Sequence, residues 1–527
     1  MPAKLKNLMH NQKPVVSIEL RSKRNVFTTM DKLDGHVTIT APVDCYFDDI
    51  EIEFVGTSRT FVERLTTASA VSGRSEAFHQ FLKLSQPNLQ FHYPEHMVLK
   101  AGQTYTFPFI FAVPEQMLLK ICQHHVNSPA VRDAHLQLPP SFGDKDAADS
   151  HEAHKDMAPD MASVRYAIFA KLIRNKPTDE GSVKTQIATK ARRVRVIPAA
   201  AEQPPVNIDG PENDYIMRKE KSVKKGLLKN KIGRIVMETQ QPKSFCLPAP
   251  RRSTEPLVEG EDQVTTLAKI MLRFDPADET QKPPKLGALA SKLKVTTFYA
   301  SSARKDFPSK AAPTVDTTQG IHTETLNLSS RCMAAAEWCK HDPANPEAQN
   351  ADARRRDSAT SVNSAYGAGF TPKPSEAYNG KTYYTARLMV PITLPSHKTF
   401  VPTFHTCLVS RIYSLNLNLA ISNAGIGPNI DLKVPVQVSA ENPSESRNTS
   451  RRNSITESMD EDNEIGDEDI SDVFQARRFS PPAADFIGGS NIGQHGGVPA
   501  PTYGEAPPGY SFFAPNGHLG GQSVPVY

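Results

Sequence analysis

The chain has 527 residues, a length that predicts more than one domain. It contains 43 prolines and one tryptophan, and only 38% of its residues are hydrophobic, so part of the chain is predicted to be disordered. Its sequence holds no run of about 18 apolar residues that could span a membrane, and the first residues lack the apolar core of a signal peptide. We therefore expect a cytoplasmic protein.

Charge is distributed unevenly along the chain. Residues 441–527 carry 13 acidic side chains against five arginines, a net charge of −8, whereas the whole chain has a net charge of +4. The remainder is therefore basic, at +12, which suits a body that rests on an anionic protein or membrane surface. No sequence feature supports a nucleic-acid partner.

Alternating apolar residues dominate the first 200 residues, and they mark strands at 16–20, 37–39, 50–54, 105–111, 164–172 and 194–196. This alternation is typical of half-buried strands, and no long segment of helical periodicity separates them. The pattern predicts an antiparallel β-sandwich. The polar and acidic segment 132–160 is expected to be a long inserted loop.

A second series of apolar runs follows at 234–238, 264–274, 292–299, 383–391, 408–421 and 432–438, and it predicts a second sandwich. The segment 341–376 is rich in Asn, Ala, Ser and Arg, and we expect it to be a disordered insert. After residue 440 no apolar periodicity remains to build a core, which predicts a disordered tail.

Several of these strands resemble the arrestin-like family. The sequences GHVTI at 35–39, IEIEFVG at 50–56 and LPPSF at 138–142 resemble the arrestin N-domain, and IDLKVPV at 430–436 is similar to the closing strand of the arrestin C-domain. The resemblance implies an all-β protein with two arrestin-like antiparallel β-sandwich domains, at 14–200 and 215–440, followed by a tail at 441–527. The inserts at 143–160 and 341–376 depart from the family pattern.

The tail contains the sequence Pro507-Pro508-Gly509-Tyr510, a P-P-x-Y (PY) motif. A polyproline II segment has no internal hydrogen bonds to lose, so its prolines can bind an aromatic WW groove at small entropic cost while the tyrosine fills the adjoining pocket. We expect Pro507, Pro508 and Tyr510 to bind a WW domain. Two weaker versions are expected to act as accessory sites through Pro501, Tyr503, Pro525 and Tyr527.

This motif places the resemblance in the α-arrestin branch, of the fungal type, whose members are arrestin-related trafficking adaptors. The resemblance implies an adaptor that recruits a WW-domain HECT ubiquitin ligase to plasma-membrane transporters or receptors and promotes their ubiquitination and endocytosis. It would be recruited peripherally to the plasma membrane and endosomes. A signalling or trafficking scaffold that uses the same fold without a ligase, as in ambient-pH signalling, is the alternative. Nothing in the sequence indicates an enzyme or a cofactor.

Arginine pairs precede hydroxyl side chains at Ser358, Ser454 and Ser480, a pattern that kinases with acidic substrate grooves recognise. We expect phosphorylation there, and a phosphoserine beside an arginine pair would suit 14-3-3 proteins. Short motifs of this kind also arise by chance.

The segment 218–234 carries eight cations, and it is interpreted either as a contact with anionic lipids or as a solvated connector. Lys433 is the last lysine of the chain, so ubiquitin must be attached to the body of the adaptor if it is attached at all. The candidate acceptors are Lys221, Lys224, Lys225, Lys229 and Lys381.

Six cysteines are scattered without any C-x-x-C pair, so the sequence predicts neither a disulfide framework nor a zinc site, and we expect reduced thiols. The histidines near Cys122 lack the spacing and the second cysteine that zinc sites use. They are interpreted as loop residues, and no metal is expected, at His124, His125, His135, His151 and His154.

Overall fold

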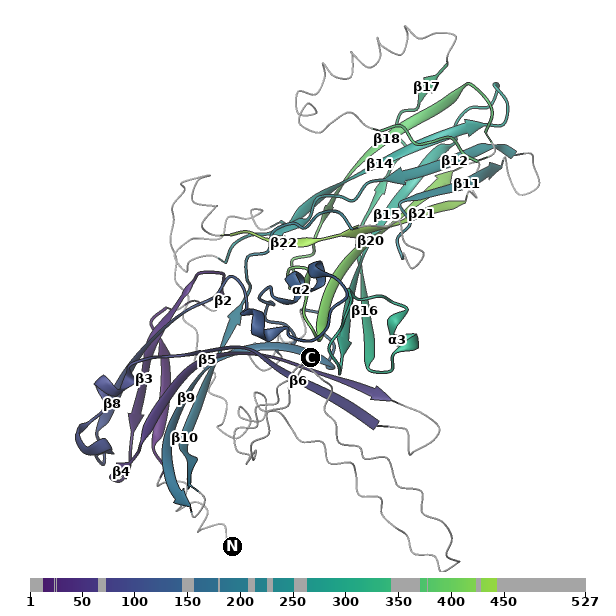
Figure 1. Ribbon diagram of the computed structural model, residues 1–527. Helices are drawn as coiled ribbons and strands as arrows, with labels where there is room; N and C mark the ends of the chain where they lie inside the picture. Colours follow the sequence, from purple (N-terminus) through teal and green to yellow (C-terminus); the bar gives the residue numbers. More distant parts are fainter. Residues whose placement is uncertain are drawn as a thin grey trace, which may run out of the picture.

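The structure is a computed structural model. It describes residues 13–22, 24, 26–64, 73–144, 156–178, 181–206, 214–224, 231–250, 263–342, 370–376, 378–422 and 428–442. Strands make up most of these residues. We call the part built from strands β1–β10 the N-lobe and the part built from strands β11–β22 the C-lobe (Figure 1).

The N-lobe is a sandwich of two sheets. Its first sheet has the order β1-β3-β8, and its second has the order β2-β10-β9-β5-β6, with all pairs antiparallel except β10 with β2. A short pair of strands, β4 with β7, lies at one edge. The strands are β1 (Val15–Leu20), β2 (Val26–Phe27), β3 (Lys32–Thr40), β4 (Cys45–Tyr46), β5 (Asp49–Arg64), β6 (Gly73–Ser85), β7 (Val98–Leu99), β8 (Thr104–Ala112), β9 (Ala162–Thr178) and β10 (Gly181–Val196).

The C-lobe repeats this two-layer plan. One sheet has the order β11-β12-β14-β18-β17, the other has the order β16-β15-β20-β19 with β21 also paired to β20, and β13 pairs with β22 in parallel. The strands are β11 (Arg218–Lys224), β12 (Lys231–Thr239), β13 (Phe245–Leu247), β14 (Thr265–Pro276), β15 (Lys285–Ala300), β16 (Gln319–Cys332), β17 (Cys339–His341), β18 (Tyr383–Thr393), β19 (Phe404–His405), β20 (Val409–Ser422), β21 (Asn429–Val436) and β22 (Val438–Ala440).

The predicted alternation is visible in the burial of the strands. Every second side chain is buried in β3 and over residues 107–111 of β8. In β20, Leu415, Leu417, Leu419 and Ile421 are buried, while the residues between them are half-buried. Side chains of a strand point to opposite faces in turn, so this pattern places one face of each sheet in the core. The all-β, two-sandwich fold class expected from the sequence is confirmed.

Three longer strands were not predicted. Strands β6 and β16 carry polar side chains on both faces, and the burial of their residues alternates weakly. Strand β11 is the sequence RKEKSVK, in which Val223 is the one buried residue. All three lie at sheet edges, where one side of the strand is unpaired, and charged side chains are common on such strands.

The segment 132–160 matches the predicted long loop only in part of its described residues. It begins inside the helix α2 (Pro129–His135), which Ser128 caps by accepting a hydrogen bond from the backbone nitrogen of Val131. The residues after it are also buried, among them Leu138, Phe142 and Met157. The composition is polar, but a few apolar residues fix both ends of this segment against the sandwich. Residues 145–155 lie outside the described part of the chain.

The second predicted insert is also anchored at its described ends. His341 closes strand β17, and the backbone nitrogen of Ser375 donates to the buried carboxylate of Asp275 at 2.7 Å. Asp275 in turn forms a buried ion pair with Arg273 at 2.7 Å. Residues 343–369 lie outside the described residues.

Glu53 of strand β5 lies between the apolar residues Ile52 and Phe54, so the alternation predicts that it faces away from the core. Its side chain is nevertheless buried. Lys83 and Lys171 on the neighbouring strands contact its carboxylate at 2.7 and 2.9 Å. Burial raises the pKa of Glu53, but the two lysines outweigh burial and lower it. A buried carboxylate on the outer face of the strand is therefore held in its charged form.

Close packing of strands β1 and β3 explains why a glycine occupies position 35, in the sequence GHVTI that resembles the arrestin N-domain. A Cβ atom on Gly35 would lie 2.0 Å from the backbone oxygen of Glu19 on β1, so no larger residue fits there without moving β1 or β3. Within the described residues, the structure contains no helix that is long and apolar enough to cross a membrane.

Candidate functional site

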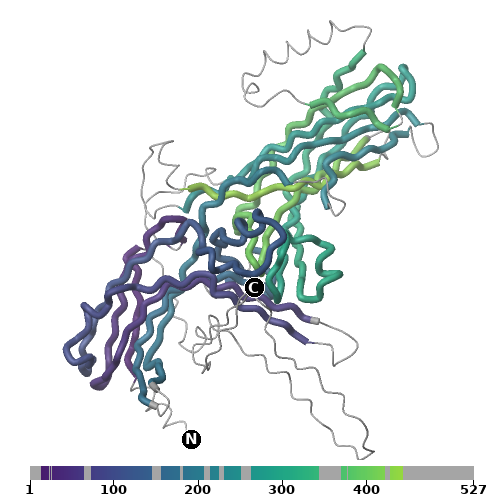
Figure 2. The backbone as a smooth tube through the Cα atoms, viewed as in Figure 1, coloured from purple at the N-terminus to yellow at the C-terminus, as the bar shows by residue number. Residues whose placement is uncertain are grey.

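The two lobes meet around helix α2 and the loop before β20, as Figures 1 and 2 show. The apolar core of the N-lobe continues into the C-lobe, because it includes Tyr299, Val401, Phe404 and Leu408. The ring of Phe142, in the LPPSF sequence, packs edge-on against Phe404 with centroids 5.8 Å apart. This shared apolar contact holds the two sandwiches against each other.

Arg411 of strand β20 is the largest fully buried side chain of the structure's described part. Its guanidinium donates to the backbone oxygen of Met157 at 3.1 Å and also to the backbone oxygen of Asp156. It lies over the ring of Phe142, 4.9 Å from the ring centroid. A side chain of the C-lobe thus satisfies backbone groups of the N-lobe.

Further hydrogen bonds join the lobes beside this arginine. The hydroxyl of Thr60 on β5 donates to the backbone oxygen of Ala300 at 2.6 Å, and the hydroxyls of Ser75 and Ser301 are 2.8 Å apart. The ends of β5 and β6 extend from the N-lobe to the C-lobe in Figure 1, which is why these contacts occur. The unpredicted strand β6 therefore contributes to the junction.

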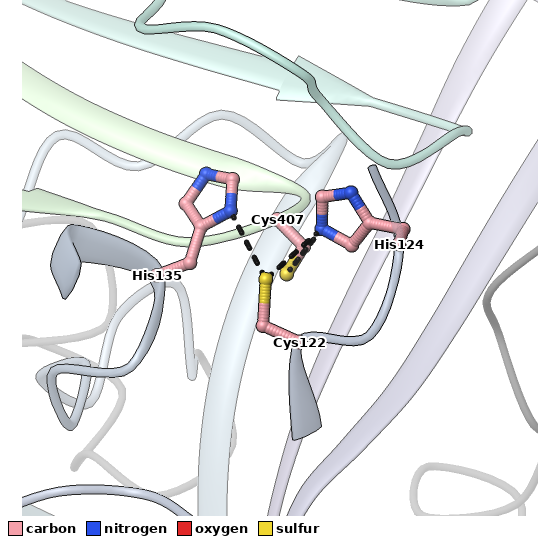
Figure 3. A group of neighbouring side chains, drawn as sticks. All are labelled: Cys122, His124, His135 and Cys407. Atoms are coloured by element: carbon pink, nitrogen blue, oxygen red, sulfur yellow. Dashed lines mark hydrogen bonds between the residues drawn. The ribbon is translucent and has the colours of Figure 1, made fainter. Parts of the chain in front are cut away.

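A group of four buried side chains, which we call the Cys–His cluster, lies at the same junction: Cys122, His124, His135 and Cys407 (Figure 3). Cys122 follows the short helix η3 (Leu119–Ile121), His135 ends helix α2, and Cys407 lies between β19 and β20 of the C-lobe. Their four ligand atoms all lie within 4.8 Å of one another.

The distances within the Cys–His cluster are short. The Nε2 atom of His124 lies 3.3 Å from the sulfur of Cys122 and 3.2 Å from that of Cys407. The Nδ1 atom of His135 lies 3.6 Å from the sulfur of Cys122. These four atoms could hold a metal ion.

The electrostatics of the cluster favour one thiolate. The contact with Cys407, followed by those with the two histidines, lowers the pKa of the Cys122 thiol, and the same contact raises the pKa of the Cys407 thiol. Burial lowers the pKa of His124, but the hydrogen bond with Cys122 outweighs burial and raises it. One negative charge is therefore placed between the sulfurs and the imidazoles.

His124 lies in the loop between η3 and α2, as interpreted, whereas His135 is not a loop residue because it ends helix α2. Both side chains are buried at the lobe junction, which the sequence did not predict. The missing second cysteine is Cys407, which lies 285 positions further along the chain than Cys122. The only local sequence signal for this cluster is the C-x-H spacing of Cys122 and His124. No local pattern could include Cys407, because it comes from the other lobe. The described part of the chain also includes His125, whereas His151 and His154 lie outside it.

In its described residues the basic segment 218–234 is not a solvated connector, because its first seven residues form strand β11 and residues 231–234 belong to β12. Arg218 pairs with Glu238 at 3.1 Å, and Lys219 pairs with Asp431 at 2.6 Å. The amine of Lys221 donates to the backbone oxygen of Asn429. These cations are engaged within the C-lobe, so a lipid contact by this segment stays a prediction.

Most of the predicted functional residues lie outside the described residues. They are the PY motif with its accessory sites, Ser358, Ser454, Ser480, Lys225 and Lys229. Among the remaining candidate acceptors, Lys224 and Lys381 are exposed and Lys221 is half-buried.

A family model described as the Bul1 C terminus matches residues 290–440, which contain most of β15 and all of β16–β22. No curated protein matches the chain. The match covers the C-lobe half of the junction, including Arg411 and Cys407. Over these residues the chain is similar to the Bul1 C-terminal family, an arrestin-related family of fungal trafficking adaptors.

Proposed function

We propose that the protein is an arrestin-related trafficking adaptor that recruits a WW-domain HECT ubiquitin ligase to transporters or receptors of the plasma membrane. The observation that carries this proposal is the match of the C-lobe to the Bul1 C-terminal family, on a chain whose tail contains a PY motif. The two sandwiches would bind cargo, and the tail would bind the ligase. Cargo ubiquitination and endocytosis would follow.

The ligase is recruited through Pro507, Pro508 and Tyr510. The prolines fit an aromatic groove in the polyproline II conformation, and the tyrosine ring fills the neighbouring pocket. The same tail carries two accessory motifs with a single proline, and several weak sites on one chain raise the effective concentration of the ligase.

Capture of the ligase by the full chain tests this assignment. The Tyr510→Ala variant should bind the WW domains at least about 10-fold more weakly, or about 1.4 kcal/mol, because the pocket for the ring is left empty. The matched control is Tyr503→Ala, which removes the ring of an accessory motif and should cause a smaller loss. Unchanged capture by Tyr510→Ala would instead support the scaffold that acts without a ligase.

Phosphorylation would regulate the adaptor. A phosphate at Ser454 or Ser480 adds a charge of about −1.5 to −2 beside an arginine pair, which 14-3-3 proteins bind with arginines of their own. The double variant Ser454→Ala, Ser480→Ala should lose 14-3-3 capture. If capture and cargo uptake are the same as in the wild type, neither serine is the switch.

Ubiquitin on the adaptor itself would be attached to the body, since no lysine follows Lys433, and the candidate acceptors belong to its second half. Lys224 and Lys381 are the exposed candidates of the described residues, and Lys221 is less accessible because its amine bonds to Asn429. Mapping of ubiquitin remnants in digests should find these lysines, Lys225 or Lys229. Remnants confined to lysines before residue 200 would overturn this assignment.

A further inference from the structure

The Cys–His cluster has the composition of a structural zinc site, with two thiols and two imidazoles. We propose that Cys122, His124, His135 and Cys407 bind one zinc ion, which fastens the N-lobe to the C-lobe. The inference goes beyond the adaptor function, and neither depends on the other.

The distances within the cluster fit tetrahedral coordination. With Zn–S bonds of about 2.3 Å and Zn–N bonds of about 2.0–2.1 Å, a regular tetrahedron places sulfur and nitrogen ligands about 3.6 Å apart. Three of the four S···N distances of the cluster are 3.2, 3.3 and 3.6 Å. For these three pairs a zinc ion needs only a few tenths of an ångström of adjustment, and the other pairs of ligand atoms lie within 4.8 Å of each other.

The residues around the cluster orient its ligands. The Nδ1 atom of His124 lies 3.0 Å from the backbone oxygen of His125, which suits a protonated Nδ1 and leaves Nε2 free to face the two sulfurs. The guanidinium of Arg132 donates to the backbone oxygens of Cys122 at 2.8 Å and of His124 at 3.4 Å. This arginine belongs to helix α2, which ends at His135, so one helix positions three of the four ligands.

Charge also favours a divalent ion at this site. Zinc binding releases to solvent the protons that the four side chains still hold, and the resulting two thiolates and two neutral imidazoles balance the charge of Zn²⁺. The site is then neutral, which avoids the large cost of leaving an uncompensated charge in a buried position. Tetrahedral sites with two sulfur and two nitrogen ligands select zinc over magnesium or calcium, which prefer oxygen.

The ligands come from both lobes, so a zinc ion bound by them would link the N-lobe to the C-lobe. Three of them come from the N-lobe segment 122–135, and Cys407 comes from the C-lobe loop directly before β20. Arg411 and Phe404 on the same C-lobe segment also contact the N-lobe. A zinc ion therefore completes a junction that otherwise consists of side-chain packing and hydrogen bonds.

Metal analysis of the full chain tests the proposal. The protein is produced in medium supplemented with zinc and purified with a reducing agent and without chelators. Its zinc content per chain is then measured by elemental mass spectrometry. We expect one zinc ion per chain. The Cys407→Ser variant should bind zinc at least about 10-fold more weakly, since even the loss of an outer partner of a ligand has an effect of that size. The matched control is Cys246→Ser, because Cys246 is exposed and outside the cluster.

A second measurement uses the wild-type chain, so it does not depend on a variant that folds. Replacement of zinc by Co²⁺ should give the visible absorption of a tetrahedral ion and a thiolate-to-cobalt charge-transfer band. Removal of the metal should raise hydrogen exchange at 119–125 and at 404–408, which belong to different lobes. Wild-type protein without zinc, or Cys407→Ser that retains wild-type zinc, would overturn the proposal. A Cys122–Cys407 disulfide in freshly isolated protein would also overturn it.

Discussion

Replacement of Arg411 by methionine should weaken the junction between the lobes. Methionine keeps an unbranched side chain of similar length but removes the guanidinium, which donates to the backbone oxygens of Met157 and Asp156. Arg411 and Met157 are each only 1% exposed, so water cannot reach the backbone oxygen of Met157 without local opening, whereas Asp156 is half-buried. Both oxygens lose their charged donor in the variant.

The size of the effect follows from two opposing contributions. A buried acceptor left without a partner costs about 1–3 kcal/mol, which gives at most about 2–6 kcal/mol for the two oxygens, because Asp156 is half-buried. The contact of the guanidinium with the Phe142 ring, 4.9 Å from its centroid, contributes about 0.5–2 kcal/mol more. Burial of the guanidinium itself costs several kcal/mol in the wild type, and that cost disappears in the variant. We expect a net loss of about 2–4 kcal/mol.

Urea unfolding of the full chain measures this loss. The Arg411→Met variant should show a lower midpoint, or two separate transitions in place of one, because the lobes would no longer unfold together. The matched control is Arg387→Met, the same change at an exposed position of strand β18, which should stay within about 0.5 kcal/mol of the wild type. A loss below about 1 kcal/mol for Arg411→Met, within the scatter of ordinary substitutions, would refute the reasoning.

Two further variants test the sandwich of the N-lobe. Because the two lysines that contact Glu53 hold its pKa below the ordinary value of 4.5, their ion pairs stabilise the fold above pH 4.5, and this contribution is lost as the pH falls through the folded-state value. Glu53→Gln should therefore be less stable than the wild type in urea at pH 7, and the difference in stability should narrow well below pH 4.5. An equal difference at both pH values would contradict this. The control is Glu51→Gln on the same strand, which removes the partner of an exposed lysine, Lys184, in place of a buried pair. Gly35→Ala should cost about 1–3 kcal/mol, because its Cβ would lie 2.0 Å from a backbone oxygen. Gly73→Ala, whose Cβ meets nothing within 4 Å, should leave the urea midpoint unchanged, and equal midpoints for both glycine variants would be evidence against close strand packing.

The alternation of apolar residues determined which parts of the chain form half-buried strands. It located strands such as β3, β8 and β20, because a sheet with one buried face requires an apolar residue at every second position. It missed β6, β11 and β16, since the residues of an edge strand are exposed over much of their surface and need no such pattern.

The polar composition of a segment did not predict correctly how its residues are buried. The sequence predicted a loop at 132–160, but helix α2 and the buried Leu138, Phe142 and Met157 bind this segment to the sandwich. Glu53 lies in an alternating strand, yet it is buried, because lysines on two neighbouring strands neutralise its charge. Composition reports the average polarity of a segment, whereas a few contacts decide where it lies.

The sequence by itself determined the fold class and, through the PY motif, a hypothesis of function that needs no tertiary structure, because a short linear motif carries its own recognition chemistry. The Cys–His cluster and the buried Arg411 could only be found in the folded chain. Cys122 and Cys407 lie 285 positions apart, and Arg411 is far in sequence from Met157, so no local pattern connects them. Packing of the two sandwiches against each other brings these residues together, because such long-range contacts form only when both lobes have folded.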